Sequence, residues 1–144
     1  MSADIHETTA LRLRRDGQFY TKNRRTLVEV LVEADRPRTV PEIMAARKGL
    51  ALSSIYRNIV VLERANVVHR IVTTGEFASY ELAEDLTRHH HHLICTGCGQ
   101  VEDFTASPQL ESSMARAFTK IAAQAGFAQK SHRVDLLGLC RNCA

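Results

Sequence analysis

The sequence predicts an α+β fold in which an N-terminal winged helix-turn-helix domain is followed by a small α/β domain with a four-cysteine site. Two observations predict it. In the first half, segments with the apolar spacing of helices precede two strand-like runs joined by a short turn. In the second half, all four cysteines fall into two Cys-x-x-Cys pairs. We expect the first domain at residues 1–83, a hinge at 84–88 and the second domain at 89–144.

Two helices are predicted at the start of the first half. Residues 7–15 predict a short helix with Leu11 as its apolar contact, and Gly17 ends it. Residues 23–34 predict a second helix, because apolar residues repeat there at helical spacing. The expected buried residues of this second helix are Leu27, Val28, Val30 and Leu31.

Capping signals mark the next two helices. Thr39-Val40-Pro41-Glu42 matches a capping box with proline in the first turn, and predicts a helix that reaches about Lys48. Ser53 or Ser54 is expected to cap a further helix that ends near Ala65. Its expected inward residues are Ile55, Ile59, Leu62 and Val60, and its expected outward residues are Tyr56, Arg57 and Asn58.

Strand-like runs follow these helices. Residues 67–72 and 77–82 are rich in β-branched and aromatic residues, and the turn Thr73-Thr74-Gly75-Glu76 between them predicts a two-stranded wing. The second half predicts strands at 93–95, 100–104 and 132–137 and a helix that begins at Ser107-Pro108 and ends at Gly126. A core alone is marginal below roughly 70–80 residues, so we expect a metal and dimerisation to stabilise this half.

The cysteines have the spacing of a tetrahedral zinc site. A two-residue gap lets both thiolates of a pair point at one centre, and two pairs complete four ligands. Two disulfides are the main alternative. No signal peptide is recognisable, so we expect a cytoplasmic protein whose thiols stay reduced. A redox-active pair is less well supported, because neither has a thioredoxin-like context. The expected zinc ligands are Cys95, Cys98, Cys140 and Cys143.

Charge is unevenly distributed along the chain. The net charge is only +3, but residues 11–25 and 36–70 are basic, whereas a run of acids comes later, from Glu76 to Glu111. This asymmetry suggests a nucleic-acid surface in the first half, with ordinary solvated charge as the alternative for any single arginine. No apolar run approaches the roughly 20 residues that a membrane helix needs, so no membrane partner is expected.

The predicted helix at residues 53–64 is the candidate DNA-reading helix. Exposed residues near the start of such a helix reach base edges in the major groove. Tyr56 suits a thymine methyl or a phosphate, and Arg57 suits guanine or a phosphate. A helix packed only for stability, or a winged helix that binds proteins, is the alternative. The expected DNA-binding residues are Ser54, Tyr56, Arg57, Asn58, Lys22, Arg24 and Arg25.

Three segments together resemble the ferric uptake regulator (Fur) superfamily. They are Ser53-Ser54-Ile55-Tyr56-Arg57, the histidine run before Leu93-Ile94-Cys95, and Ser131-His132-Arg133-Val134-Asp135-Leu136 before the second cysteine pair. The resemblance spans nearly the whole chain. It implies a dimeric, metal-activated transcription factor whose winged helix binds an inverted repeat in double-stranded DNA. It also implies that the C-terminal α/β domain forms the homodimer and holds the structural zinc.

The resemblance implies two further metal sites. A regulatory site at the hinge would use Glu81, His90 and His92, to which we add His69. A site inside the dimerisation domain would use His89, His91, Glu111 and His132. Successive side chains of an extended segment point to opposite faces, which suits this alternation. Structural roles are the alternative for single members: a core histidine at 132, a first-turn acid at 111 and a surface charge at 81. Asp103 is an alternative carboxylate for either site.

By this resemblance the function is a metal-responsive repressor of metal-ion homeostasis, with no enzymatic activity. Zinc uptake is preferred, because His69 and an all-histidine run resemble zinc-sensing members. Those members also use a cysteine after the second wing strand, where this chain has Glu81-Leu82-Ala83-Glu84. An iron- or manganese-responsive regulator is the alternative, because imidazole binds several of these metals. The regulatory ion is therefore expected to be Zn²⁺, Fe²⁺ or Mn²⁺.

Two alternatives come from other functional classes. Zinc deaminases pair His-x-Glu with Pro-Cys-x-x-Cys. This histidine run lacks that glutamate, and Ile94 and Leu139 precede the two cysteine pairs, so a zinc enzyme is disfavoured. A metal store or a protein-interaction module would differ from the preferred function in lacking specific DNA binding.

Overall fold

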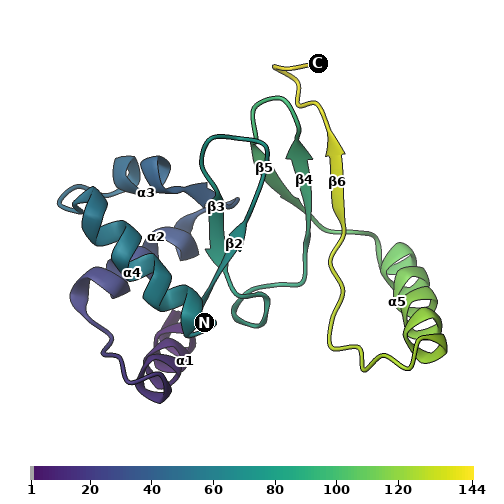
Figure 1. Cartoon of the computed structure of the whole chain (residues 1–144), viewed down its shortest axis with the longest axis horizontal. Coiled ribbons are helices and arrows are strands. Elements are labelled where there is room, and N and C mark those ends of the chain that lie inside the picture. The colour runs from purple at the N-terminus through teal and green to yellow at the C-terminus, as the bar shows by residue number, and fades with distance from the viewer. Residues whose placement is uncertain (1) are drawn as a thin grey trace.

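The computed structural model describes residues 2–144 and joins a helical half to a half built on a second sheet (Figure 1). This arrangement confirms the α+β class and the winged-helix first half. The elements are α1 (Ser2–Arg15), α2 (Lys22–Glu33), β1 (Arg38–Thr39), α3 (Val40–Ala46), α4 (Leu52–Arg64), β2 (Val68–Ile71), β3 (Ser79–Leu82), a 3-10 helix (Glu84–Leu86), β4 (His91–Cys95), β5 (Val101–Phe104), α5 (Pro108–Gln124) and β6 (Asp135–Gly138).

The wing is a three-stranded antiparallel sheet in the order β1-β3-β2. The predicted hairpin is present, and its register places Arg70 opposite Tyr80. Strand β1 was not predicted, because its two residues carry no alternating pattern and it exists only through pairing with β3. This pairing ties the start of α3 to the wing, since Thr39 caps α3 through the predicted capping box.

The core of the first half forms where α1, α2, α3 and α4 pack against the wing. The four predicted residues of α2 are buried, as are Ile55, Ile59 and Leu62 of α4, but Val60 was wrongly expected inward and is 42% exposed. In α1 the prediction was wrong, because Leu11 is 44% exposed and Leu13 is fully buried. The helix begins at Ser2 rather than residue 7, so its inward face runs through Ile5, Thr9 and Leu13 at helical spacing.

Helix α4 corrects two further predictions. It begins at Leu52 with Ala51 as a cap that forms no side-chain hydrogen bond, so neither predicted serine caps it. Asn58 does not face outward but is 8% exposed, because its amide is paired between α2 and α4. The preceding helix α3 also ends earlier than predicted, at Ala46, where Arg47 adopts an extended backbone.

The second sheet has the order β5-β4-β6, with β4 antiparallel to β5 and parallel to β6. Helix α5 lies beyond β6, on the side away from the helical half (Figure 1). Ser107 caps α5 as expected, but Ala122 is its only buried residue among those described. Strand β6 begins at Asp135, so His132 lies in the segment before it. Within residues 2–144 every helix is too short or too polar to span a bilayer.

The wing turn rests on the first cysteine loop. Thr74 Oγ1 donates to the carbonyl of Thr96 at 3.0 Å. A Cβ added at Gly99 would lie 2.6 Å from the Cα of Gly75, and Gly99 has a φ of +80°. Only a residue without a side chain permits both this backbone and this approach. The tip of the wing and the cysteine loop are therefore in direct backbone contact.

We predict that Gly99→Ala destabilises the protein more than Gly17→Ala. Gly17 has a similar φ of +71° but no atom within 4 Å of an added Cβ. Gly17→Ala, the control, should lower the free energy of unfolding by about 1–2 kcal/mol through backbone strain alone. Gly99→Ala should cost about 1–3 kcal/mol more, because the new methyl group displaces the wing turn. Urea denaturation measures both, and equal losses would show that the contact does not constrain the wing.

Candidate functional site

The four cysteine thiols converge where the loop after β4 meets the chain beyond β6. Their ligand atoms all lie within 4.8 Å of one another, and the sulfurs of Cys98 and Cys140 are 3.8 Å apart. A tetrahedron of sulfurs bound to zinc at 2.3 Å has edges of about 3.8 Å. Disulfide sulfurs lie near 2.05 Å, and all four thiols are free, so the disulfide alternative does not fit.

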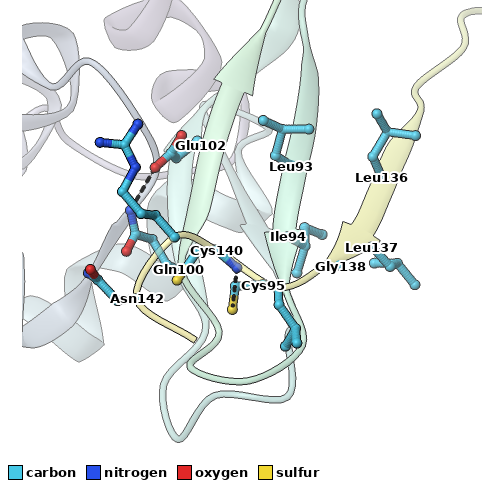
Figure 2. A pocket seen from close by; sticks show the side chains of 12 residues that line it. Leu93, Ile94, Cys95, Gln100, Glu102, Leu136, Leu137, Gly138, Cys140 and Asn142 are labelled. Atoms are coloured by element: carbon cyan, nitrogen blue, oxygen red, sulfur yellow. Dashed lines mark hydrogen bonds between the residues drawn. The ribbon is translucent and has the colours of Figure 1, made fainter. Parts of the chain in front are cut away.

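Backbone N–H groups prepare one of these thiols for ionisation. The N–H groups of Cys140 and Cys98 donate to the sulfur of Cys95 at 3.3 and 3.4 Å, as Figure 2 shows for Cys140. They lower the pKa of Cys95 to about 6. Hydrogen bonds to the neighbouring cysteine sulfurs instead raise the pKa of Cys143 to about 12. Cys143 can be a thiolate at neutral pH only beside a cation, which is what a zinc site supplies.

A second group of ligand atoms joins the two halves of the chain, and we call it the hinge cluster. It comprises Glu81 from β3, His90 and His92 at the start of β4, and Asp103 from β5. The Nε2 atoms of His90 and His92 lie 2.8 and 2.9 Å from the carboxylate of Glu81. The same two atoms lie 3.8 and 3.7 Å from Asp103 Oδ1. These are separations of donors that share one ion.

Both hinge-cluster histidines are oriented by their other ring nitrogen. His90 Nδ1 donates to the carbonyl of Arg88 at 2.7 Å, and His92 Nδ1 lies 3.3 Å from Asp135 Oδ1. These contacts orient both rings with Nε2 toward Glu81, where a bound ion would take the place of the Nε2 proton. His92 Nε2 is buried and has no hydrogen-bond partner of good geometry within the described residues. A buried ring nitrogen without a well-aligned partner, aimed at two carboxylates, fits a metal ligand.

The charges of the hinge cluster are mutually stabilised. Burial by itself would raise the pKa of Glu81, but the rings of His92 and His90 hold it below its usual value. Burial raises the pKa of Asp103, which has weaker contacts with the same rings. The cluster therefore presents one firmly ionised carboxylate and a second that a nearby cation would favour in its charged form.

The structure does not bring His69 into the hinge cluster. Its Cα lies opposite that of Glu81 in the wing, but its Nε2 contacts Asn66 Oδ1 at 3.0 Å. Asp103, named only as an alternative carboxylate, lies there instead. The reason is the register of β4 and β5, which pairs His92 with Asp103. Sequence spacing gives no signal for that register.

A third group, the inner cluster, comprises His89, His91, Glu111 and His132. Glu111 Oε2 lies 3.0 Å from His132 Nε2, and Glu111 Oε1 lies 3.2 Å from His89 Nε2 and also contacts His91 Nε2. The N–H of Val134 donates to His91 Nδ1 at 3.1 Å. A neutral His91 ring must then carry its proton on Nε2, the atom that faces Glu111. In this orientation the inner cluster fits a metal less well than the hinge cluster.

The predicted DNA-binding residues other than the buried Asn58 lie on a cationic surface across the start of α2 and α4. Tyr56 is 40% exposed, and Arg57, Lys22 and Arg25 are exposed, whereas Ser54 and Arg24 are half-buried. Neither α2 nor α4 has an acid in its first turn, although α3 and α5 both do. Cations at the positive end of a helix dipole are unfavourable unless an anion approaches them.

The fold and these clusters define a class of protein: a winged-helix protein with a four-thiol site and a ligand cluster between its two halves. The sequence model of a protein family, the "Ferric uptake regulator family", matches residues 15–137 of this chain. The chain belongs to this family.

Curated relatives and solved structures agree with this assignment. The ferric uptake regulation protein of Campylobacter jejuni is 34% identical, over 91% of this chain and 83% of its own length. The peroxide operon regulator of Bacillus subtilis is 28% identical, over 92% and 88%. The structure of the Helicobacter pylori ferric uptake regulator covers 99% of this chain and 93% of its own, with a TM-score of 0.74 and 26% identity.

We predict that Cys95→Ser abolishes zinc retention and destabilises the fold. The variant removes the thiol with the lowered pKa, and loss of a structural metal is among the most destabilising single changes, at about 4 kcal/mol or more. Zinc content is measured by elemental analysis and stability by urea denaturation. Asn142→Ser, between Cys140 and Cys143, is the matched control. A zinc-free Cys95→Ser protein of unchanged stability would contradict the structural role.

Proposed function

We propose that this protein is a cytoplasmic, metal-responsive repressor that binds an inverted repeat in DNA as a homodimer and controls metal-ion homeostasis, with zinc uptake as its expected target. The hinge cluster carries the proposal, because it draws ligands from both halves of the chain. The relatives described above are regulators by name, so the role is regulation rather than enzymatic catalysis. We further propose that residues 84–88 are the hinge between a DNA-binding domain at 1–83 and a dimerisation domain at 89–144.

The position of Glu81 explains how the cluster would act on DNA binding. Glu81 lies in β3, the central strand of the wing, and β3 pairs with both β1 and β2. Because α4 leads directly into β2, a fixed Glu81 also fixes the orientation of α4. A bound cation would supply the positive charge that holds Glu81 and Asp103 against the same two imidazoles. The Nδ1 contacts of His90 and His92 keep Nε2 directed at that centre, so the closed arrangement, with Glu81 against its histidines, is favoured when metal is present.

The bound metal must favour the closed arrangement over the open one strongly enough to switch DNA binding. An ion must prefer the closed arrangement by roughly 10⁴-fold to shift a two-state equilibrium from 1:99 to 99:1. A partly buried site with two imidazoles and two carboxylates from separate segments can discriminate to this extent, because opening separates Glu81 from its histidines and dismantles the ligand set.

An unpaired apolar surface supports the homodimer. A groove of about 550 Å³ runs along β4 and β6 to the cysteine cluster (Figure 2). Leu93, Leu136 and Leu137 line it and are 41%, 52% and 69% exposed. Residues of this size rarely face water together unless another surface covers them. A two-fold dimer through this sheet would present two copies of α4, which is the symmetry of an inverted repeat.

The donor atoms bear on which metal is sensed. The Helicobacter pylori structure is described as having three functional metal binding sites, and a similar solved structure is a zinc-bound manganese uptake regulator, with a TM-score of 0.63 and 26% identity. These descriptions support structural zinc at the cysteines and a regulatory ion at the hinge cluster. The histidine run favours zinc. The absence of sulfur among the described hinge ligands, together with Asp103, favours Fe²⁺ or Mn²⁺ as the second candidate.

We predict metal-dependent binding to operator DNA. Protein with its structural zinc in place is titrated with buffered Zn²⁺, Fe²⁺, Mn²⁺ or Ni²⁺, and binding to a pool of inverted repeats is measured by fluorescence anisotropy. Retention of specific DNA at low free Zn²⁺ but not with Fe²⁺ would support the zinc-uptake role. A response to Fe²⁺ or Mn²⁺ alone would favour the second candidate. No specific binding with any metal would reject the repressor.

We predict that Glu81→Ala and His92→Ala lower metal-dependent DNA binding by at least about 10-fold without unfolding the protein. Each variant removes a donor that faces the common centre of the hinge cluster. His69→Ala is the matched control, because His69 contacts Asn66 instead and should leave the metal dependence unchanged. Unchanged metal dependence in both cluster variants would disprove the clamp, and a loss in His69→Ala would place His69 among the ligands.

A further inference from the structure

The side chain of Arg24 connects three segments of the first half. Its Nε donates to Asn58 Oδ1 in α4 at 3.0 Å. Its Nη1 donates to the carbonyl of Phe19, in the loop before α2, at 2.7 Å. Arg24 itself lies in the first turn of α2. One guanidinium therefore fixes the start of α2, the loop that leads into it and the middle of α4.

The partner in α4 is buried and depends on this contact. Asn58 is 8% exposed, and its Nδ2 donates to Ser54 Oγ at 3.1 Å. Asn23 Nδ2 approaches the same hydroxyl at 3.4 Å. Without Arg24, the amide oxygen of Asn58 would lose its donor in a site that water reaches poorly. This small polar network sets how α4 sits on α2, and it lies beside the exposed residues Tyr56 and Arg57.

Arg25 shows a different arrangement one residue further on. It is exposed, and its Nε lies 3.3 Å from Glu29 at i,i+4 on the same helix. Arg24 is half-buried, and its hydrogen-bond partners within the described residues are both uncharged oxygens. Two adjacent arginines of equal charge therefore have different surroundings, and only one of them holds the recognition helix.

We propose that Arg24 and Asn58 are positioning residues that set the orientation of α4 and thereby the sequence specificity of DNA binding, rather than contacts to the phosphate backbone. The inference rests on the proposed DNA-binding function. It separates the cationic surface into two parts. Lys22, Arg25 and Arg57 provide charge toward DNA, whereas Arg24 uses the fork of its guanidinium within the protein.

A charge-preserving substitution tests this role. Arg24→Lys keeps the positive charge but cannot bond Asn58 and Phe19 together, and Arg25→Lys is the matched control. Affinities for an operator selected by the wild type and for unrelated DNA are measured over a range of salt concentrations with metal-loaded dimer. We expect Arg24→Lys to lower operator affinity about 10-fold while binding to unrelated DNA and its salt dependence stay unchanged. Arg25→Lys is the control for amide hydrogen exchange in α4 without DNA, which it should leave at the wild-type rate.

Asn58→Ala and the double variant complete the test. Asn58→Ala should give a similar loss, and Arg24→Lys combined with Asn58→Ala should lose little more than either alone, because both remove one interaction. Faster amide hydrogen exchange in α4 of Arg24→Lys, without DNA, should accompany these losses. A different pair of results would identify a phosphate contact and overturn the proposal. Arg24→Lys would keep the operator affinity and the amide exchange of the wild type, and Arg24→Gln would reduce the slope of log affinity against log salt concentration by about 1.

The same measurements distinguish failure of the proposed DNA-binding function from failure of the positioning role of Arg24. If the wild type showed no preference for any operator, the proposed function would fail. Hydrogen exchange in α4 would still decide the present inference, because it needs no DNA. Exchange that is faster in Arg24→Lys but not in Arg25→Lys would support the positioning role, and equal exchange in both would reject it.

Discussion

The carboxylate of Glu81 is the interaction on which the relation between the two halves depends. It belongs to the central strand of the wing, yet its nearest polar partners are His90 and His92 from the second half. Its side chain is only 13% exposed, so its negative charge needs these partners or a cation. Any ion that binds there acts on the wing directly, without a long chain of intermediate contacts.

The opposite end of the wing is also fixed to the second half. The turn after β2 contacts the cysteine loop through Thr74 and Gly75, while β3 carries Glu81 at the other end. The cysteine site supports the first contact and the hinge cluster supports the second. Because the hairpin of β2 and β3 joins these two contacts, the wing is attached to the second half at both of its ends.

The sequence predicts best what is local. The capping box at Thr39, the four buried residues of α2 and the convergence of the cysteines each follow from spacing within one or two short segments. The sequence predicts less well what depends on how segments pack. The burial of Asn58 requires Arg24 from another helix, and Asp103 joins the hinge cluster through strand register. A two-residue strand such as β1 leaves no pattern to detect.

The four consecutive histidines show how one extended segment can serve two different centres. Alternation along the chain sends His90 and His92 to the hinge cluster and His89 and His91 to the inner cluster. The second ring nitrogen then distinguishes the two. At His92 it can donate to a carboxylate, so that Nε2 can give up its proton to a cation, whereas at His91 it accepts a backbone N–H, so that the neutral ring keeps its proton on Nε2. Metal binding at the inner cluster requires that ring to reorient, so the hinge cluster is the better prepared of the two to bind an ion first.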